Sequence, residues 1–143
     1  MKTSIIYKKN FITVSGEKQE LKKALVKLIS NVIQKEKKIF TSLDLIFCSD
    51  ELIREYNMKY LDHDYETDII TFYDIDEEEG IEGELLISVD TVKSNSLRYK
   101  TSFNNELSRV VIHGLLHLCG YKDKTAAQKQ VIRKKENYFL NIK

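Results

Sequence analysis

Two histidines four residues apart give the clearest chemical signal in this sequence. His113 and His117 lie in an uncharged run, and this spacing places both side chains on one face of a helix, where two imidazoles can bind one metal ion. Gly120 can end that helix in a left-handed conformation and turn the chain back, so that Asp123 supplies a third ligand. Three protein ligands leave a fourth position for water, which is typical of a catalytic zinc site.

The same spacing has two other interpretations. It is close to that of the metzincin peptidases, except that Gly114 stands where those enzymes carry a catalytic glutamate and an aspartate replaces their last histidine. Because glycine cannot accept a proton, the peptidase interpretation lacks a general base. The simplest alternative is a pair of partly buried helix histidines, with Asp123 and Lys124 forming a polar turn before the next helix.

The hydrophobic periodicity around this pattern predicts an α+β fold. We expect strands over residues 3–7 (continuing at 11–14), 42–48, 69–73 and 84–89, an acidic loop over 74–83, and helices over 21–33, 49–60, 90–97, 102–118 and from 126 onward. This order favours a mixed sheet of about four strands covered by helices, with the metal site on a late helix in a zincin-like arrangement. Since no linker or repeat interrupts the chain, we predict a single domain over residues 1–143.

The composition is that of a soluble protein. With 143 residues, of which 42% are hydrophobic, the chain can form a core without disulfide or metal cross-links. Cys48 and Cys119 are expected to be small buried residues rather than a disulfide framework. The apolar run over 110–121 is too short to span a bilayer, and Lys8 and Lys9 interrupt the N-terminal one. We therefore expect a cytoplasmic protein with no membrane partner.

The charges are segregated although the net charge is only +1. Residues 44–90 contain 16 acidic side chains, with Arg54 and Lys59 as the basic ones, and the flanks are basic. If the fold gathers the basic flanks on one face, that face can attract a polyanion. The alternative is that they are ordinary solvated helix surfaces.

At these residues the sequence resembles the YbeY family of metal-dependent endoribonucleases, which are also described as ribosomal RNA maturation factors. The family's helix signature, H-G-x-L-H-L-x-G-Y-D-H, is matched in register from His113 to Tyr121. Two preceding blocks are also matched, by Asn57, Tyr60, Thr67, Asp68, Thr71 and Phe72, and by Gly83, Glu84, Ile87 and Ser88.

The resemblance implies a zinc-dependent, single-strand-specific endoribonuclease that acts in rRNA processing at the 3′ end of 16S rRNA and in ribosome quality control. Its expected partners are single-stranded RNA or rRNA and the ribosome or its small subunit, and no DNA. We expect one Zn²⁺ per chain, although the harder carboxylate ligand leaves room for another divalent ion.

The hypothesis for the site assigns each role to particular residues. Metal binding falls to His113, His117 and Asp123, catalysis to His113, His117 and Glu84, and substrate binding to Lys122, Lys124 and Arg109. Asp68 is a second candidate for the general base, although a turn or cap role is the simpler interpretation. His63 is expected to be a surface residue.

The sequence departs from the family pattern at three positions. Asp123 replaces the usual third histidine, Lys122 occupies the preceding aspartate position, and Leu61 stands where the family has an arginine. Lys122, Lys124, Arg109 and Arg98 are the candidates to replace that arginine. Its loss keeps open a non-catalytic ribosome-assembly factor whose metal braces the fold, beside the metallopeptidase alternative.

Overall fold

The computed structural model describes residues 3–7, 18–61 and 67–141, with side chains from residue 20 onward. The expected strand continuation at 11–14 and His63 lie outside the described residues. The described elements follow one another as β1 (Thr3–Tyr7), α1 (Lys18–Glu36), β2 (Phe40–Cys48), α2 (Asp50–Leu61), β3 (Ile69–Asp76), β4 (Gly80–Ser88), α3 (Val89–Arg98), α4 (Phe103–Leu118) and α5 (Ala126–Leu140). No helix among these is both long and apolar enough to cross a membrane.

The four described strands form one mixed sheet in the order β1-β2-β4-β3. β1 pairs with β2 and β2 with β4 in parallel, whereas β3 pairs with β4 in the antiparallel direction. The long parallel connections are made by helices, as such crossovers require. The α+β class and the mixed four-stranded sheet predicted from the sequence are confirmed.

The acidic segment is a hairpin rather than the loop expected over 74–83. β3 and β4 pair as far as Asp76 and Gly80, and the Asp76 carboxylate accepts hydrogen bonds from the backbone N–H groups of Glu78 and Glu79 in the turn. Gly80 has a φ of +117°, which favours glycine. The loop prediction was wrong because backbone pairing continues where the side chains of β3 lie in solvent, although Ile81 on β4 is still buried.

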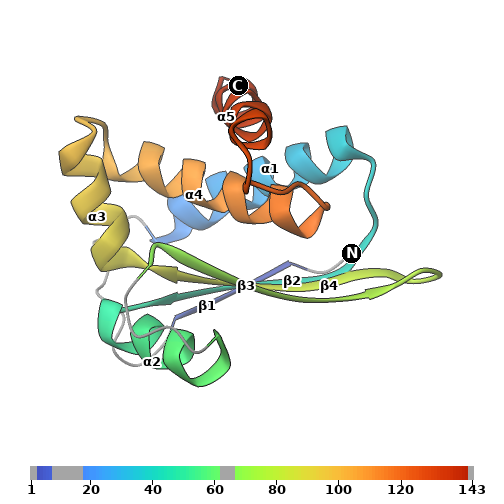
Figure 1. The fold of residues 1–143 in the computed structure, drawn as a ribbon, viewed down its shortest axis with the longest axis horizontal. Coiled ribbons are helices and arrows are strands. Elements are labelled where there is room, and N and C mark those ends of the chain that lie inside the picture. Colours follow the sequence, from blue (N-terminus) through green and yellow to red (C-terminus); the bar gives the residue numbers. More distant parts are fainter. Residues whose placement is uncertain (1–2, 8–17, 62–66, 142–143) are drawn as a thin grey trace.

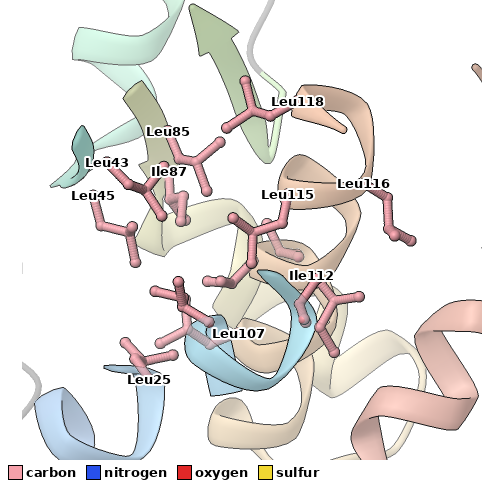
Figure 2. Close-up of a cluster of buried hydrophobic side chains, with 14 of the residues drawn as sticks. Leu25, Leu43, Leu45, Leu85, Ile87, Leu107, Ile112, Leu115, Leu116 and Leu118 are labelled. Atoms are coloured by element: carbon pink, nitrogen blue, oxygen red, sulfur yellow. The ribbon is translucent and has the colours of Figure 1, made fainter. Parts of the chain in front are cut away.

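Helices cover the two faces of the sheet unequally (Figure 1). α1, α4 and α5 lie on one side, which we call the α4 face, and α2 lies on the other, the α2 face. Side chains alternate along β4, so that Leu85 belongs to the core of the α4 face and Leu86 to that of the α2 face. Figure 2 shows the larger core, in which leucine side chains of α4 and the strands interdigitate.

α4 lies directly against the sheet because small residues allow a close approach. A Cβ atom on Gly114 would come within 2.6 Å of Ile69 Cδ1 and 2.9 Å of Leu85 Cδ2. On β4, a Cβ on Gly83 would come within 2.7 Å of Leu118 Cδ1. The contacts fix α4 over β3 and β4, and therefore fix the position of any side chain on the exposed stripe of this helix.

Candidate metal centre

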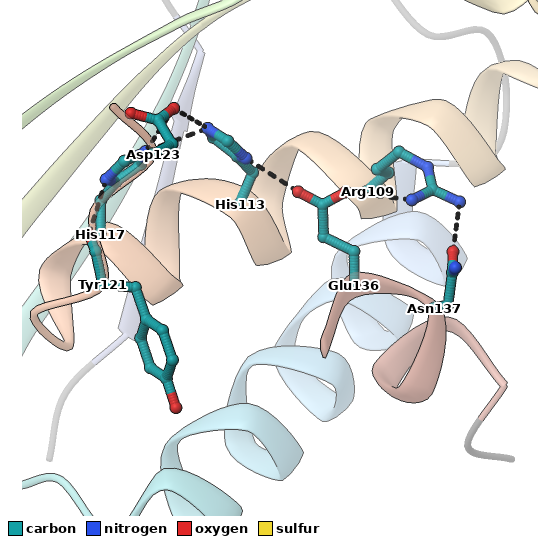
Figure 3. A network of polar contacts seen from close by, with 7 residues as sticks. All are labelled: Arg109, His113, His117, Tyr121, Asp123, Glu136 and Asn137. Carbon is teal, nitrogen blue, oxygen red and sulfur yellow. Dashed lines mark hydrogen bonds and ion pairs between the residues drawn. The ribbon is translucent and has the colours of Figure 1, made fainter. Parts of the chain in front are cut away.

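α4 and the turn after it bring the three predicted metal ligands together (Figure 3). The Nε2 atoms of His113 and His117, one helical turn apart, are separated by 3.0 Å. α4 ends at Leu118, and Gly120, with a φ of +104°, turns the chain back as the sequence predicts. Asp123 Oδ2 consequently lies 3.4 Å from His113 Nε2 and 3.3 Å from His117 Nε2.

Hydrogen bonds to the other ring nitrogens fix the orientation and the tautomer of the two imidazole rings. His113 Nδ1 lies 2.8 Å from Glu136 Oε2, and His117 Nδ1 lies 3.0 Å from the backbone oxygen of Tyr121. An ionised carboxylate and a carbonyl only accept hydrogen bonds, so both Nδ1 atoms donate. In neutral rings the two Nε2 lone pairs then face each other, which is unfavourable unless a cation or a proton lies between them.

The donor set fits a divalent ion. Ligand atoms about 2.0–2.1 Å from a tetrahedral zinc lie about 3.3 Å from one another. The three distances among these donor atoms, 3.0, 3.3 and 3.4 Å, are close to that value. The side chains are 25–42% exposed, which leaves one side of the triad open to solvent. Among the described residues, this is the cluster that could hold a metal.

The surrounding charges favour a cation at this position. Burial by itself lowers the pKa of the His113 ring, but the hydrogen bond and charge of Glu136 oppose it. Asp68 and Asp123 add to this effect, and the pKa of His113 is raised as a result. The site therefore stabilises positive charge on or beside the ring.

Glu136 on α5 is a functional residue that the sequence analysis missed. Its side chain is buried, and it accepts one hydrogen bond from His113 and another, of 3.0 Å, from Arg109 Nη1. Burial favours the neutral acid, but His113 and Arg109 outweigh it and lower the pKa of Glu136. The ionised carboxylate holds His113 in the orientation and tautomer that metal binding requires.

Arg109 lines a hollow along α4 and is bonded to two residues of α5. Besides its bond to Glu136, it donates from Nη2 to Asn137 Oδ1 over 3.1 Å. Arg109 lies one helical turn before His113, but only the packing of α5 on α4 shows that its partners are Glu136 and Asn137. The role of Arg109 in substrate binding stays a prediction.

The turn that carries Asp123 is anchored by Tyr121. The Tyr121 hydroxyl donates to Glu36 Oε1 over 2.6 Å, and Glu36 Oε2 accepts from Lys135 Nζ over 2.8 Å. Lys135 also lies over the Tyr121 ring, 5.4 Å from its centroid. The anchor joins the turn to α1 and α5, and so holds the carbonyl that accepts the hydrogen bond from His117.

Glu84 does not lie at the triad. Its neighbours on β4, Gly83 and Leu85, face Leu118 and Gly114 of α4. Because strand side chains alternate, Glu84 points to the α2 face. The resemblance placed its block near the metal helix, but the sheet lies between this carboxylate and the imidazoles.

Asp68 lies where two hollows meet beside the triad. One hollow, of about 490 Å³, contains the three candidate ligands and Asp68 and is also lined by Leu61. The second, of about 570 Å³, shares His113 and Asp68 with the first and extends along α4. Burial raises the pKa of Asp68, although the charge of His113 opposes the shift. Of the two predicted candidates for a general base, Asp68 is the one that borders the site.

The predicted basic contacts flank the candidate ligand. Lys122 and Lys124 are exposed on either side of Asp123 in the turn between α4 and α5. Leu61 replaces the expected arginine at the first hollow and offers it no positive charge. Any phosphate contact beside the triad therefore has to come from another residue.

The fold and the triad together define an α+β protein with a candidate metal centre of the open type. A family model described as "Endoribonuclease YbeY" matches residues 5–142. The chain belongs to the YbeY family.

Relatives cover most of this chain. An endoribonuclease YbeY from Cytophaga hutchinsonii is 45% identical over 115 residues, which make up 80% of each chain. One from Chloroherpeton thalassium is 46% identical over 124 residues, or 86% of this chain and 87% of the relative. The solution structure of TM1509 from Thermotoga maritima matches 98% of this chain and 87% of its own, with a TM-score of 0.65 and 24% identity, and shows similarity of fold.

Proposed function

We propose that this protein is a zinc-dependent endoribonuclease that hydrolyses phosphodiester bonds in single-stranded RNA. The observation that carries the proposal is the triangle of His113 Nε2, His117 Nε2 and Asp123 Oδ2, with edges of 3.0–3.4 Å and one side open to solvent. Membership of the YbeY family supports RNA as the substrate.

Different residues of the chain have different roles in the proposed hydrolysis. His113, His117 and Asp123 would hold the ion, and Glu136 keeps the Nδ1 proton on His113. A divalent ion there supplies Lewis acidity toward a phosphate oxygen and favours the ionisation of water. Asp68 borders the same hollow, and we assign it to accept a hydrogen bond from the attacking water. The water oxygen bonds to phosphorus and its proton passes to the Asp68 carboxylate. The P–O bond to the leaving ribose oxygen breaks, and that oxygen takes up the proton.

Lys122 and Lys124 are the proposed contacts to the RNA backbone. Their exposed positions next to Asp123 would let them neutralise phosphates beside the reacting one. RNA affinity should then fall as salt is added, and the Lys122→Ala, Lys124→Ala double variant should reduce the slope by about 1.4 units in a plot of log affinity against log salt, at about 0.7 unit for each contact to a single strand. An unchanged slope would remove these lysines from the binding surface.

The biological setting that we propose comes from the family. We place the activity in the cytoplasm, in maturation of the 3′ end of 16S rRNA and in ribosome quality control, with the small ribosomal subunit as partner. Binding of the purified protein to isolated small subunits, compared with large subunits, tests this setting separately from the chemistry.

The decisive variant is His117→Ala. We expect it to lose bound zinc, measured by elemental mass spectrometry, together with cleavage of a labelled single-stranded RNA. Glu82→Gln, an exposed change on β4, is the control and should retain both. Cleavage that survives in His117→Ala would contradict the assignment.

The outcome also separates the alternatives. Leu61 at the first hollow favours a non-catalytic assembly factor as the second candidate, because it removes a charge that the reaction would use. Such a factor would bind RNA and metal but cleave neither RNA nor casein, whereas a peptidase would cleave casein.

A further inference from the structure

The second hollow beside the triad extends along α4 beyond Asp68 and His113, the two lining residues that the proposed hydrolysis uses. Its volume of about 570 Å³ falls within the range of sites for small ligands. It is lined by side chains from the end of α3, the polar stripe of α4 and α5, and by Asp68. Those that matter here are Asn95, Tyr99, Thr101, Asn105, Glu106 and Arg133.

Glu106 faces this hollow from the same side of α4 as His113. The two residues are seven positions apart, which is two turns and about 10 Å along the helix axis. Glu106 is only 4% exposed, yet no hydrogen bond or ion pair joins its carboxyl group to another group among the described residues. Buried carboxyl groups are ordinarily partnered, so an unpartnered one that lines a cavity indicates a ligand that brings hydrogen-bond donors.

The electrostatics of the pocket support the same conclusion. Burial is the largest cause that raises the pKa of Glu106, and the charges of Asp68 and Glu136 raise it further, against the opposing charges of Arg109 and Arg133. The charged carboxylate thus lacks the donors that would stabilise it. Because Arg109 is already bonded to Glu136, the carboxylates outnumber the available cations, and a phosphate would be repelled from the interior.

The remaining lining suits a planar, polar ring. Tyr99 is 61% exposed and presents an aromatic surface at the end of α3. Asn105 donates from its amide to Thr101 Oγ1 over 2.8 Å, and Asn95 adds a second amide. Aromatic faces that stack on a base and amides that bond its edge are the usual means by which proteins hold an unpaired nucleotide.

We propose that this hollow, the Glu106 pocket, binds the base of a nucleotide next to the scissile phosphate, with the Glu106 carboxylate accepting hydrogen bonds from N–H groups on the base edge. Guanine is the best match, because its N1–H and 2-amino groups are adjacent donors that two carboxylate oxygens can accept together. Adenine, cytosine and uracil offer no such adjacent pair. This inference rests on the proposed function, since it assumes that an RNA strand crosses the triad.

Mononucleotide binding tests the pocket without any need for cleavage. The experiment is a calorimetric measurement of the affinities of guanosine, inosine and uridine monophosphates for the zinc-loaded full chain. Inosine monophosphate lacks only the 2-amino group, and we expect the guanosine nucleotide to bind about tenfold more tightly. Equal affinities in the unaltered protein would overturn the proposal without reference to a variant.

Variants then show which residue causes the preference for the guanosine nucleotide over the inosine nucleotide. Glu106→Gln should bring the guanosine and inosine nucleotides to within twofold of each other, with unchanged zinc content and thermal midpoint. Tyr99→Ala, an exposed change, should weaken both nucleotides and keep their ratio. Glu82→Gln is the matched carboxylate control and should alter neither. A preserved ratio in Glu106→Gln would contradict the assignment.

Cleavage separates failure of this inference from failure of the nuclease proposal. In a uridine-rich strand with one guanosine, the unaltered protein should cut beside the guanosine, and Glu106→Gln should cut more evenly. Efficient cleavage at all positions by both proteins would sustain the nuclease and overturn the pocket assignment. Absence of cleavage by the unaltered protein, with the nucleotide preference intact, would overturn the nuclease and leave the pocket standing.

Discussion

The two faces of the sheet differ in how firmly they hold what lies on them. Among the described residues, the α4 face carries α1, α4 and α5 and contains the larger buried cluster, whereas the α2 face carries α2 and a cluster of five buried residues, among them Ile53 and Leu86 (Figure 1). The metal triad stands on the first face, and Glu84 points to the second. Ligand atoms whose positions must be held to within about 0.5 Å lie where packing fixes the backbone most completely.

The side-chain contacts also differ between the two faces. On the α4 face, hydrogen bonds join each candidate histidine to a group outside the triad, through Glu136 and the Tyr121 carbonyl. On the α2 face, the rings of Tyr56, Tyr60 and Phe72 contact one another, with Tyr60 edge to face on Phe72, and Tyr60 is more than half exposed. The first face orients ionisable groups, and the second presents aromatic surface.

The largest effect that tests this comparison is expected from two adjacent leucines. Leu85 and Leu86 are both fully buried, one on each face. Leu85→Ala should lower the free energy of unfolding by about 4 kcal/mol and Leu86→Ala by about 2 kcal/mol, because the smaller cluster can relax around a cavity. Urea titration measures both. Equal losses would show that the two cores are equally rigid.

A second test compares a carboxylate on each face. Glu136→Ala should weaken zinc binding about 10–100-fold, since the His113 ring loses the acceptor that orients it. Glu84→Gln should change zinc affinity less than twofold because the sheet separates it from the triad. Competition with a chromophoric chelator measures affinity, and Glu136→Gln, which retains an acceptor oxygen, should restore part of it. Zinc affinity that depends on Glu84 would refute its placement on the α2 face.

A smaller effect is expected at the contact between α4 and the sheet. In Gly114→Ala, the new methyl group would displace Ile69 and Leu85, at a cost of about 1–3 kcal/mol. The better helix propensity of alanine recovers about 0.5–1 kcal/mol, which leaves a net loss of about 1 kcal/mol. Thermal unfolding checks the stability. A more stable variant would mean that α4 does not rest as closely on β3 and β4.

The smallest effect concerns two buried cysteines, one in each cluster. Burial raises the pKa of the Cys119 thiol to about 11, so at pH 8 this thiol is protonated and reacts slowly. In rising urea, Cys48 should be labelled by a maleimide before Cys119, because the α2 face opens first. Mass spectrometry after digestion distinguishes the two sites. Simultaneous labelling would indicate that both faces unfold as one unit.

Much of the fold could be predicted from the sequence because hydrophobic periodicity reports directly on burial. The helices expected over 102–118 and from 126 onward both appear in the structure, as α4 and α5. The burial of both cysteines is likewise confirmed. The acidic hairpin was mistaken for a loop, since charged side chains on a solvated edge hide the pairing of the backbone.

The candidate site likewise contains some residues that the sequence could predict and others that it could not. His113, His117, Gly120 and Asp123 are local in sequence, so helical spacing and one turn predict their convergence. Glu136 is 23 residues from His113 and on another helix, and no local pattern marks it as the partner of that ring. Arg109 is a second example, because its sequence position predicts a phosphate contact but gives no sign of its bonds to Glu136 and Asn137 on α5.

The sequence by itself determined the candidate metal triad, the class of the fold and the family, because each depends on short-range spacing or on motifs of adjacent residues. Only the tertiary structure decided which carboxylates lie near the triad. Glu84 points to the α2 face, Glu136 is hydrogen-bonded to His113, and Glu106 lines the second hollow. The physical reason is that strand alternation and helix packing set the direction of a side chain. That direction is fixed by neighbours far away in the chain.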